Sequence, residues 1–289
     1  MVDTLVILAP GLLGGSVAQA ARARDAARRI VIWARRPEVR LRLADQPWCD
    51  EVADTPAAAV AQASLVIIAT PVTRVVDLVE QIAPHLPAHA IVTDVGSVKG
   101  EICRRAQVAL ATHQASATFL GSHPMAGSAL TGWANGSPDL FENRICFITP
   151  RGDPPAAAVT QLTKFWQDLG SEVISADPDA HDEIVAHISH LPQLLATTLG
   201  HTLSAKPARW SQLAGNGLKD TTRIAASDAQ MWIEILEQNR DEILRALNTY
   251  EDELHRLRTA LSNRDWPELR TRLERGKVWR DNLDRKSVV

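Results

Sequence analysis

Cysteine is scarce in this sequence: only Cys49, Cys103 and Cys146 occur in 289 residues, and no C-x-x-C pair is present. This absence excludes the paired-cysteine patterns of a zinc knuckle or a redox-active dithiol. A sparse, odd cysteine count is typical of a reducing cytoplasm, where we expect the protein to reside. A basic excess is also missing, because the formal net charge is −3. We therefore expect no nucleic-acid partner.

Long apolar runs are absent as well. No segment approaches the ~20 apolar residues that a membrane-spanning helix needs, so we expect no membrane partner. The N-terminus MVDTLVILAP has no basic region before its apolar residues and does not resemble a signal peptide. The sequence contains 45% hydrophobic and 22% charged residues, which is ordinary for a globular protein with a sizeable core.

The first part of the chain alternates short apolar runs with alanine- and leucine-rich segments such as Leu12–Arg24 and Arg74–His85. Most of the runs are apolar at successive positions, which is typical of strands buried on both faces of a parallel sheet. The alternation predicts βαβ units and a doubly wound α/β fold. The predicted strands are Thr4–Ala9, Ile30–Ala34, Leu65–Thr70, Ala90–Val95, Thr118–Ser122 and Ile145–Thr149.

The pattern changes near Ser175. Asp177 followed by Pro178 predicts a helix start, with the aspartate as N-cap and the proline in the first helical position. No convincing strand follows. We therefore predict two domains, a dinucleotide-binding domain over residues 1–176 and an all-α domain over residues 177–289.

Further helix boundaries are expected in the second domain. Ser227-Asp-Ala-Gln230 predicts a capping box that opens a helix, and the amphipathic run from Met231 to about Leu261 predicts one long helix. Trp266-Pro267 predicts a break before the last helix.

A glycine-rich loop follows the first predicted strand, with the sequence Ala9-Pro10-Gly11-Leu12-Leu13-Gly14-Gly15-Ser16. Its position between a strand and a helix is that of a dinucleotide-binding fingerprint. Gly11 lets the backbone approach the pyrophosphate, Gly14 permits close packing of helix on strand, and the helix N-terminus supplies free N–H groups. Ala9 stands at the first glycine of the pattern, and Pro10 after it removes one amide, so the turn must be altered. An ordinary βα turn and a degraded binding loop are the alternatives.

The end of the second predicted strand bears on cofactor choice. Ala34 stands where an acidic residue that favours NAD is expected, and Arg35 and Arg36 follow. Because guanidinium groups suit a 2′-phosphate, we expect NADP, with NAD as the alternative. The two arginines could instead form a solvated loop. The expected cofactor set is Gly11, Leu12, Leu13, Gly14, Arg35, Arg36, Thr70 and Pro71.

Four further motifs occur in order: Asp94-Val-Gly-Ser97-Val-Lys99, His123-Pro-Met-Ala-Gly127-Ser128, Ser189-His190-Leu-Pro192 and Lys219-Asp220-Thr-Thr222-Arg223-Ile. With the glycine loop, they resemble the prephenate/arogenate dehydrogenases of tyrosine biosynthesis, from about residue 4 to 260. The resemblance implies a Rossmann-like N-terminal domain, an all-α C-terminal dimerisation domain and a homodimer. It also implies oxidation of prephenate or arogenate by NAD(P) with loss of carbon dioxide, which yields 4-hydroxyphenylpyruvate or tyrosine.

The resemblance also implies roles for the motif residues. His123 is expected to accept the substrate's hydroxyl proton, a task that suits an imidazole of near-neutral pKa. We place it after a strand, at the carboxyl edge of the sheet, where ligands bind in open α/β folds. Ser97 is expected to orient His123 or the substrate, and could also cap a helix. Lys99 lies either near the site or in solvent.

The expected substrate-binding residues are His190, Arg223, Gly217 and Trp232. The guanidinium of Arg223 can bind a carboxylate of the dicarboxylate substrate through two parallel bonds. Gly217 lies with Gly215 in a stretch that resembles the family's pocket-lining turn. Trp232 either approaches the site from a partner subunit or packs within a dimer or the core.

A metal site is the alternative use of Glu183, His187 and His190, which are spaced i, i+4 and i+7 along one predicted helix. The spacing is not that of an H-E-x-x-H motif, no cysteine is near, and the family that the sequence resembles needs no metal. We therefore expect none. Pro192 should distort the helix.

Two rival functions stay open. One is a β-hydroxyacid-type dehydrogenase. Such enzymes share a lysine on the long helix between the domains, and the predicted helix from Pro178 to Ser204 contains no lysine. The other is a non-catalytic binding protein on a dehydrogenase scaffold, which Ala9-Pro10 suggests. Ala129 stands where many relatives carry an acidic or polar residue, so the choice between prephenate and arogenate is open, as is feedback by tyrosine.

Overall fold

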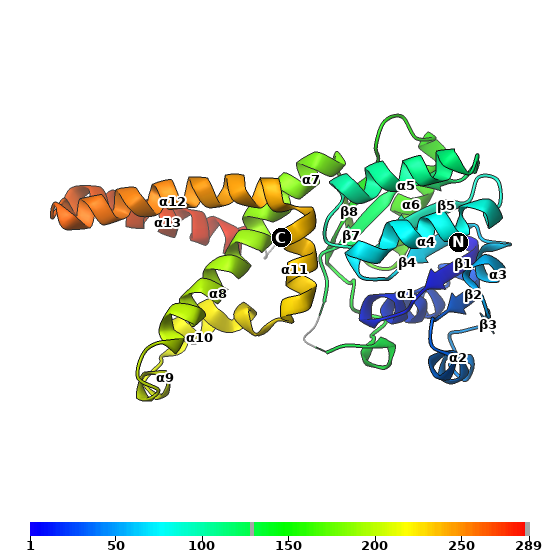
Figure 1. The fold of residues 1–289 in the computed structure, drawn as a ribbon, viewed down its shortest axis with the longest axis horizontal. Coiled ribbons are helices and arrows are strands. Elements are labelled where there is room, and N and C mark those ends of the chain that lie inside the picture. The colour runs from blue at the N-terminus through cyan, green and yellow to red at the C-terminus, as the bar shows by residue number, and fades with distance from the viewer. Residues whose placement is uncertain (128–129, 287–289) are drawn as a thin grey trace. The chain divides into compact units, whose positions relative to one another are not determined.

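The computed structural model describes residues 1–127 and 130–286 (Figure 1). The chain forms two compact units, Met1–Arg240 and Asp241–Val289. The first unit contains the sheets and the shorter helices, and the second contains the last two long helices. The domain boundary expected after residue 176 falls inside the first unit and stays a prediction.

A six-stranded parallel sheet forms the centre of the first unit, in the order β3-β2-β1-β4-β5-β6. Its order reverses between β1 and β4, which is where ligands bind in doubly wound folds. The expected fold class is therefore confirmed. The strands are β1 (Val2–Leu8), β2 (Ala27–Trp33), β3 (Glu51–Val52), β4 (Leu65–Ile68), β5 (Ile91–Asp94) and β6 (Thr118–Phe119).

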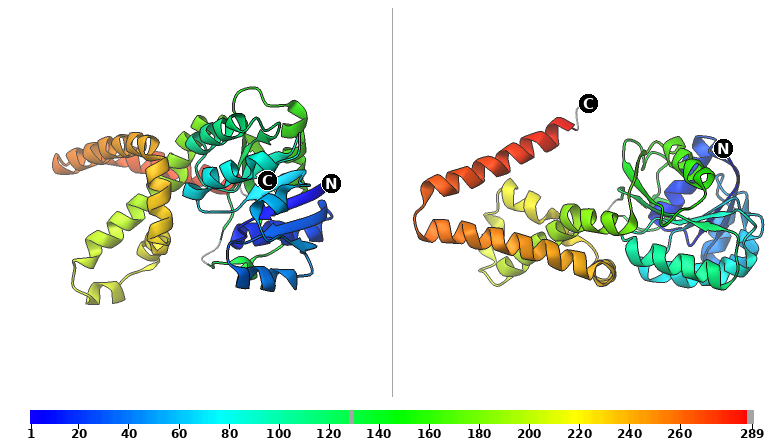
Figure 2. Two further views of the ribbon diagram at one scale, coloured as in Figure 1. Left: turned by 45° about the vertical axis from the view of Figure 1, so that its right-hand side comes forward. Right: turned by 90° about the horizontal axis from the view of Figure 1, so that it is seen from above.

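Helices cover both faces of this sheet (Figures 1 and 2). Leu5 and Ile7 of β1 pack into a core cluster with α1 and α6, whereas Val6 and Leu8 pack into a second cluster with α4 and α5. Burial on both faces explains why the strand is apolar at successive positions. The helices are α1 (Leu12–Ala23), α2 (Pro37–Ala44), α3 (Pro56–Val60), α4 (Val75–Ile82), α5 (Gly100–Thr112) and α6 (Ala156–Asp168), with 3-10 turns η1 (Val72–Arg74), η2 (Ala83–His85) and η3 (Trp133–Asn135).

A second, three-stranded sheet corrects two strand predictions. It consists of β7 (Gly121–Pro124), β8 (Ile145–Thr149) and β9 (Glu172–Ser175), with β7 antiparallel and β9 parallel to β8. The predicted strand Thr118–Ser122 is thus divided between two sheets, and Ile145–Thr149 belongs to the smaller one. Gly121 permits the crossing, because a Cβ there would lie 2.7 Å from the Cys103 sulfur.

The helices after β9 begin as the sequence predicts. The Asp177 carboxylate accepts the Asp179 N–H at 2.9 Å and caps α7 (Pro178–Val185). A π-helical turn, η4 (Ala186–His190), precedes α8 (Leu191–Ser204), so the helix is distorted beside Pro192 as expected. The remaining elements of this unit are α9 (Arg209–Gln212), α10 (Asn216–Thr222), η5 (Arg223–Ala226) and α11 (Ala229–Gln238).

Two details of the later helices differ from expectation. Asp228, rather than Ser227, caps α11 by accepting the Met231 N–H at 2.8 Å. The single helix expected from Met231 to about Leu261 is interrupted at Asn239, whose side-chain amide donates to the backbone carbonyl of Asp182 at 2.8 Å. The second unit contains α12 (Arg240–Ser262) and α13 (Trp266–Lys286). None of the described helices is long and apolar enough to cross a membrane.

Candidate active site

A cavity of about 720 Å³ opens at the carboxyl ends of β1, β2 and β4. It lies where the strand order reverses, and its walls come from the turns after these three strands. Ala9, Pro10, Arg35, Arg36, Thr70 and Pro71 are among the lining residues. The structure therefore brings four of the eight expected cofactor residues, namely Arg35, Arg36, Thr70 and Pro71, to one cavity, whereas Gly11, Leu12, Leu13 and Gly14 are not among its lining residues.

The turn at this cavity fits a dinucleotide. Gly11 caps α1 without any side-chain hydrogen bond, and the first turn carries no acidic residue, so the helix N-terminus suits an anion. A Cβ on Gly14 would lie 2.8 Å from the Ala69 Cβ, and a Cβ on Gly11 would meet nothing within 4 Å. The buried Thr70 hydroxyl has no hydrogen-bond partner among the described residues. Close packing of helix on strand and open space above the turn are the features that the glycines of a dinucleotide-binding loop provide.

Ala9 explains why glycine is favoured at the first position of the fingerprint. Its φ is +58°, in the left-handed region that disfavours a side chain. Its N–H donates to the Trp33 carbonyl at 2.8 Å, which fixes the turn against β2. The turn thus forms despite the substitution, at a cost of about 1–2 kcal/mol.

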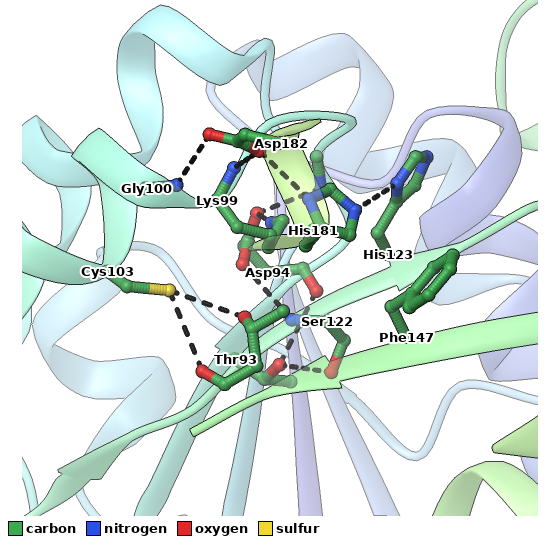
Figure 3. Close-up of polar contacts among 12 residues, drawn as sticks. Thr93, Asp94, Lys99, Gly100, Cys103, Ser122, His123, Phe147, His181 and Asp182 are labelled. Carbon is green, nitrogen blue, oxygen red and sulfur yellow. Dashed lines mark hydrogen bonds and ion pairs between the residues drawn. The ribbon is translucent and has the colours of Figure 1, made fainter. Parts of the chain in front are cut away.

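His123 lies within β7, not after a strand of the main sheet, which corrects its expected position. It is buried, and its Nδ1 lies 2.9 Å from Nε2 of His181 on α7. Nδ1 of His181 lies 2.8 Å from a carboxylate oxygen of Asp182 (Figure 3). Burial lowers the pKa of His123 well below 6.5, and the neighbouring groups His181, Lys99 and His190 lower it further. The imidazole is therefore neutral at pH 7 and can accept a proton.

The segment Asp94–Lys99 lies beside this histidine. Lys99 has no exposed surface and pairs with the Asp94 carboxylate, which also accepts the Gly96 N–H at 2.9 Å (Figure 3). The solvent-facing alternative for Lys99 was wrong, because the buried carboxylate draws the ammonium inward. Ser97 is half-buried and does not cap α5, which begins at Gly100.

β7 is tied to the carboxyl end of β5 by Ser122. Its hydroxyl lies 2.7 Å from that of Thr93 and accepts the Trp166 indole N–H at 3.0 Å. These buried contacts hold the small sheet, and with it His123, against the main sheet.

His190 is buried on the π-helical turn, and burial lowers its pKa to about 4. Its Nδ1 lies 3.1 Å from the Asn239 amide nitrogen, which also donates to the Asp182 carbonyl. Because that nitrogen donates, Nδ1 accepts and Nε2 carries the proton. This Nε2 and the Trp232 indole nitrogen are both buried without a partner among the described residues, and the two rings meet edge to face at 5.9 Å. Trp232 makes this contact within the single chain.

The other expected substrate residues, Arg223 and Gly217, are not buried with this cluster. Arg223 begins η5, which packs against α8, and both Arg223 and Gly217 are exposed. No hydrogen bond or ion pair joins Arg223 to His123 or His190 in the described part of the chain. Ser128 of the histidine motif and Ala129 lie outside the described residues.

His181 and Asp182 were missed by the sequence reasoning. Both are buried on α7, together with Pro178 and Val185. A histidine and an aspartate on the buried stripe of an amphipathic helix are the signal that could have found them. By contrast His187, considered for metal binding, is exposed and bonds to the Glu183 carbonyl. No metal-binding group of three or more His, Cys, Asp or Glu side chains occurs among the residues that the structure describes.

A doubly wound sheet in this strand order, with a pyrophosphate-type turn, is typical of nicotinamide-nucleotide-linked dehydrogenases. The buried, neutral His123 adds a group that can accept a proton. The prephenate dehydrogenase nucleotide-binding domain matches residues 17–175, and the prephenate dehydrogenase dimerization domain matches residues 177–275. The chain therefore belongs to the prephenate dehydrogenase family, whose members are dehydrogenases of tyrosine biosynthesis.

Individual relatives agree with this assignment. The prephenate dehydrogenase of Bacillus subtilis is 32% identical over 98% of this chain and 76% of its own length. A crystal structure of prephenate dehydrogenase from A. aeolicus, in complex with hydroxyphenyl propionate and NAD+, is 27% identical with a TM-score of 0.89, covering 98% of this chain and 99% of that one. The Synechocystis arogenate dehydrogenase is 27% identical with a TM-score of 0.86, over 97% and 99% of the two chains.

Proposed function

We propose that this protein oxidises prephenate or arogenate at the ring carbon that carries the hydroxyl group, with loss of carbon dioxide. The observation that carries the proposal is the buried, neutral His123, positioned by bonded side chains in a chain of the prephenate dehydrogenase family. A bound nicotinamide supplies the acceptor for the hydride that leaves this carbon.

His123 then has two tasks. It accepts the hydroxyl proton as the carbonyl forms, which is general-base catalysis. When the carboxylate leaves as carbon dioxide, the electron pair of the broken bond enters the ring and the carbonyl oxygen takes up a proton from His123. The proton is returned, so one substrate yields one phenol, one carbon dioxide and one reduced nicotinamide.

Substrate binding involves the donors of the helical segment. His190 presents an unpartnered Nε2–H next to the Trp232 indole, and two buried donors suit an anionic or carbonyl oxygen. Arg223 is exposed and carries the guanidinium that we assign to a substrate carboxylate. Gly217 completes the proposed substrate-binding set, and Ser97 orients His123 or the substrate.

The proposed cofactor is NADP. Arg35 and Arg36 are exposed, line the cavity at the end of β2 and follow Ala34, which cannot accept a bond from a ribose hydroxyl. Arg36 lies 3.7 Å from Glu38, an exposed pair that a phosphate can displace. Gly11, Leu12, Leu13, Gly14, Thr70 and Pro71 are the proposed pyrophosphate and nicotinamide contacts.

We also infer a homodimer, formed through the helical region after residue 177. The match of residues 177–275 to a dimerization domain supports it. So do exposed apolar residues of the last two helices, namely Leu254, Leu257, Leu261, Leu273, Val278 and Trp279. Sedimentation equilibrium of the full chain should give twice the 31.6 kDa monomer mass, and a monomer at micromolar concentration would contradict this inference.

One steady-state assay tests the substrate and cofactor proposals together. It crosses prephenate and arogenate with NAD and NADP and follows the absorbance of the reduced nicotinamide. Turnover with either substrate supports the proposed reaction, and a higher kcat/KM with NADP supports the use of Arg35 and Arg36. A clear preference for NAD would contradict the cofactor assignment, and no turnover by folded protein would contradict the reaction.

A further inference from the structure

Three buried side chains form a hydrogen-bonded chain that ends at His123. Asp182 bonds to Nδ1 of His181 at 2.8 Å, and Nε2 of His181 bonds to Nδ1 of His123 at 2.9 Å. Figure 3 shows the second ring nitrogen of His123 on the side away from His181. His181 has no exposed surface and Asp182 is 5% exposed, so water does not compete for these bonds.

The direction of each bond follows from Asp182. One carboxylate oxygen accepts the Lys99 N–H and the other accepts the Gly100 N–H, each at 2.8 Å. These amides begin α5, where the helix dipole favours a negative charge. The carboxylate is thus an acceptor at both oxygens, so Nδ1 of His181 must donate to it.

The same reasoning continues to the next ring. A neutral histidine that donates from Nδ1 has a lone pair on Nε2. Nε2 of His181 therefore accepts, and Nδ1 of His123 must donate to it. This leaves Nε2 of His123 without a proton and with its lone pair free.

We propose that His181 and Asp182 are positioning residues that hold His123 in the Nδ1–H tautomer, so that its Nε2 is the atom that accepts the substrate proton. The proposal rests on the proposed function for the reaction itself, whereas the tautomer is a property of the free protein. The proton leaves the hydroxyl oxygen, binds Nε2 and later returns to the same oxygen. No other reactant is needed.

Packing around His181 supports a fixed geometry. Phe147 of β8 meets the His181 ring edge to face at 5.1 Å, and the rings of His181 and His123 also lie 5.1 Å apart, at 70°. The His181 ring therefore cannot turn without displacing Phe147 or His123. Asp182 joins α7 to the first amides of α5, so the chain links the helical segment to the main sheet's helices.

The tautomer can be measured in the full-length wild-type protein labelled with 15N-histidine. Long-range 1H–15N spectra at pH 7 distinguish a protonated ring nitrogen from an unprotonated one, and the His123→Asn variant identifies the His123 signals by their loss. We expect His123 to carry its proton on Nδ1. A proton on Nε2, or on both nitrogens, would overturn the proposal. This result does not depend on turnover, so inactivity towards prephenate and arogenate would count against the proposed function alone.

Variants test whether the chain acts in catalysis. Asp182→Asn removes the negative charge and one of the two acceptor oxygens, so it weakens the bond that orients His181, and loss of the His123 tautomer costs about 10²–10⁴ in kcat with little change in KM. Asp179→Asn, an exposed aspartate on the same helix, is the matched control and should keep the wild-type kcat.

A second variant, His181→Phe, tests the same proposal. It is needed because Asp182 also binds the start of α5, so Asp182→Asn could fail to fold. His181→Phe should give a mixture of His123 tautomers and a lower kcat. An unchanged tautomer and kcat in either folded variant would overturn the proposal.

Discussion

Lys99 and Asp94 form an ion pair in which neither side chain has any exposed surface. The lysine is the residue just before α5, and the aspartate is the last residue of β5. The pair closes the turn that contains Ser97 and brings a positive charge near His123. It therefore links the fold of this turn to the chemistry of the histidine.

Removing one partner of this pair should be costly. Lys99→Met leaves the Asp94 carboxylate buried without its cation, and breaking a buried pair in this way costs about 3–5 kcal/mol. Urea denaturation measures the change in the free energy of unfolding. Arg104→Met, which breaks the exposed Arg104–Glu101 pair, is the control and should cost less than about 1 kcal/mol. Equal losses in the two variants would contradict the role given to burial.

Replacing the proposed base should affect chemistry more than binding. His123→Asn should lower kcat by about 10²–10⁴ while the dissociation constant of the nucleotide stays close to that of the wild type. Stopped-flow turnover and fluorescence titration with the nucleotide measure the two effects separately. His187→Asn removes an exposed histidine and should behave like the wild type. Unchanged turnover in His123→Asn would refute the assignment.

The pH dependence of kcat/KM follows from the lowered pKa of His123. The active form is the unprotonated imidazole, so activity is retained above the folded-state pKa and lost as the pH falls through it. Because that pKa lies well below 6.5, kcat/KM should stay flat from about pH 8 to about pH 6.5 and fall only in more acidic buffer. The charged or titratable groups near His123 are His181, Asp182, Lys99, Asp94 and His190. An acid limb centred at or above pH 6.5 would contradict this prediction.

Arg223 should contribute to substrate affinity. Arg223→Ala removes the guanidinium assigned to a substrate carboxylate, and bonds of this charged type are worth about 1.5–3 kcal/mol. We expect the substrate KM to rise about 10- to 100-fold with a smaller change in kcat. Arg209→Ala, on exposed α9, is the matched control. A selective loss of nucleotide affinity would contradict this assignment, because it would show that Arg223 binds the nucleotide and not the substrate.

Much of the fold follows from local sequence signals. The buried strand Leu65–Ile68, the Asp177 cap and the glycine turn were predictable because each depends on residues adjacent in the chain. The division of Thr118–Ser122 between two sheets was not predictable, because it depends on contacts of Gly121 with Cys103 and Thr149, which are distant in sequence.

The site shows the same limit. His123 and His190 were predicted from a family resemblance, and both are buried in the structure. The bonds that orient them come from Asp182 and Asn239, which no local motif marks. α11 ends just before Asn239, whose backbone leaves the helical conformation and whose side-chain amide bonds to the Asp182 carbonyl and to His190.

The most direct test of the proposed reaction is its stoichiometry. Wild-type protein would be incubated with prephenate and NADP, and in parallel with arogenate, while reduced nicotinamide and released carbon dioxide are measured in the same vessel. The account predicts one carbon dioxide for each reduced nicotinamide, with a phenolic product in equal amount. Reduction without carbon dioxide release, or no reaction by folded protein that binds the nucleotide, would contradict it.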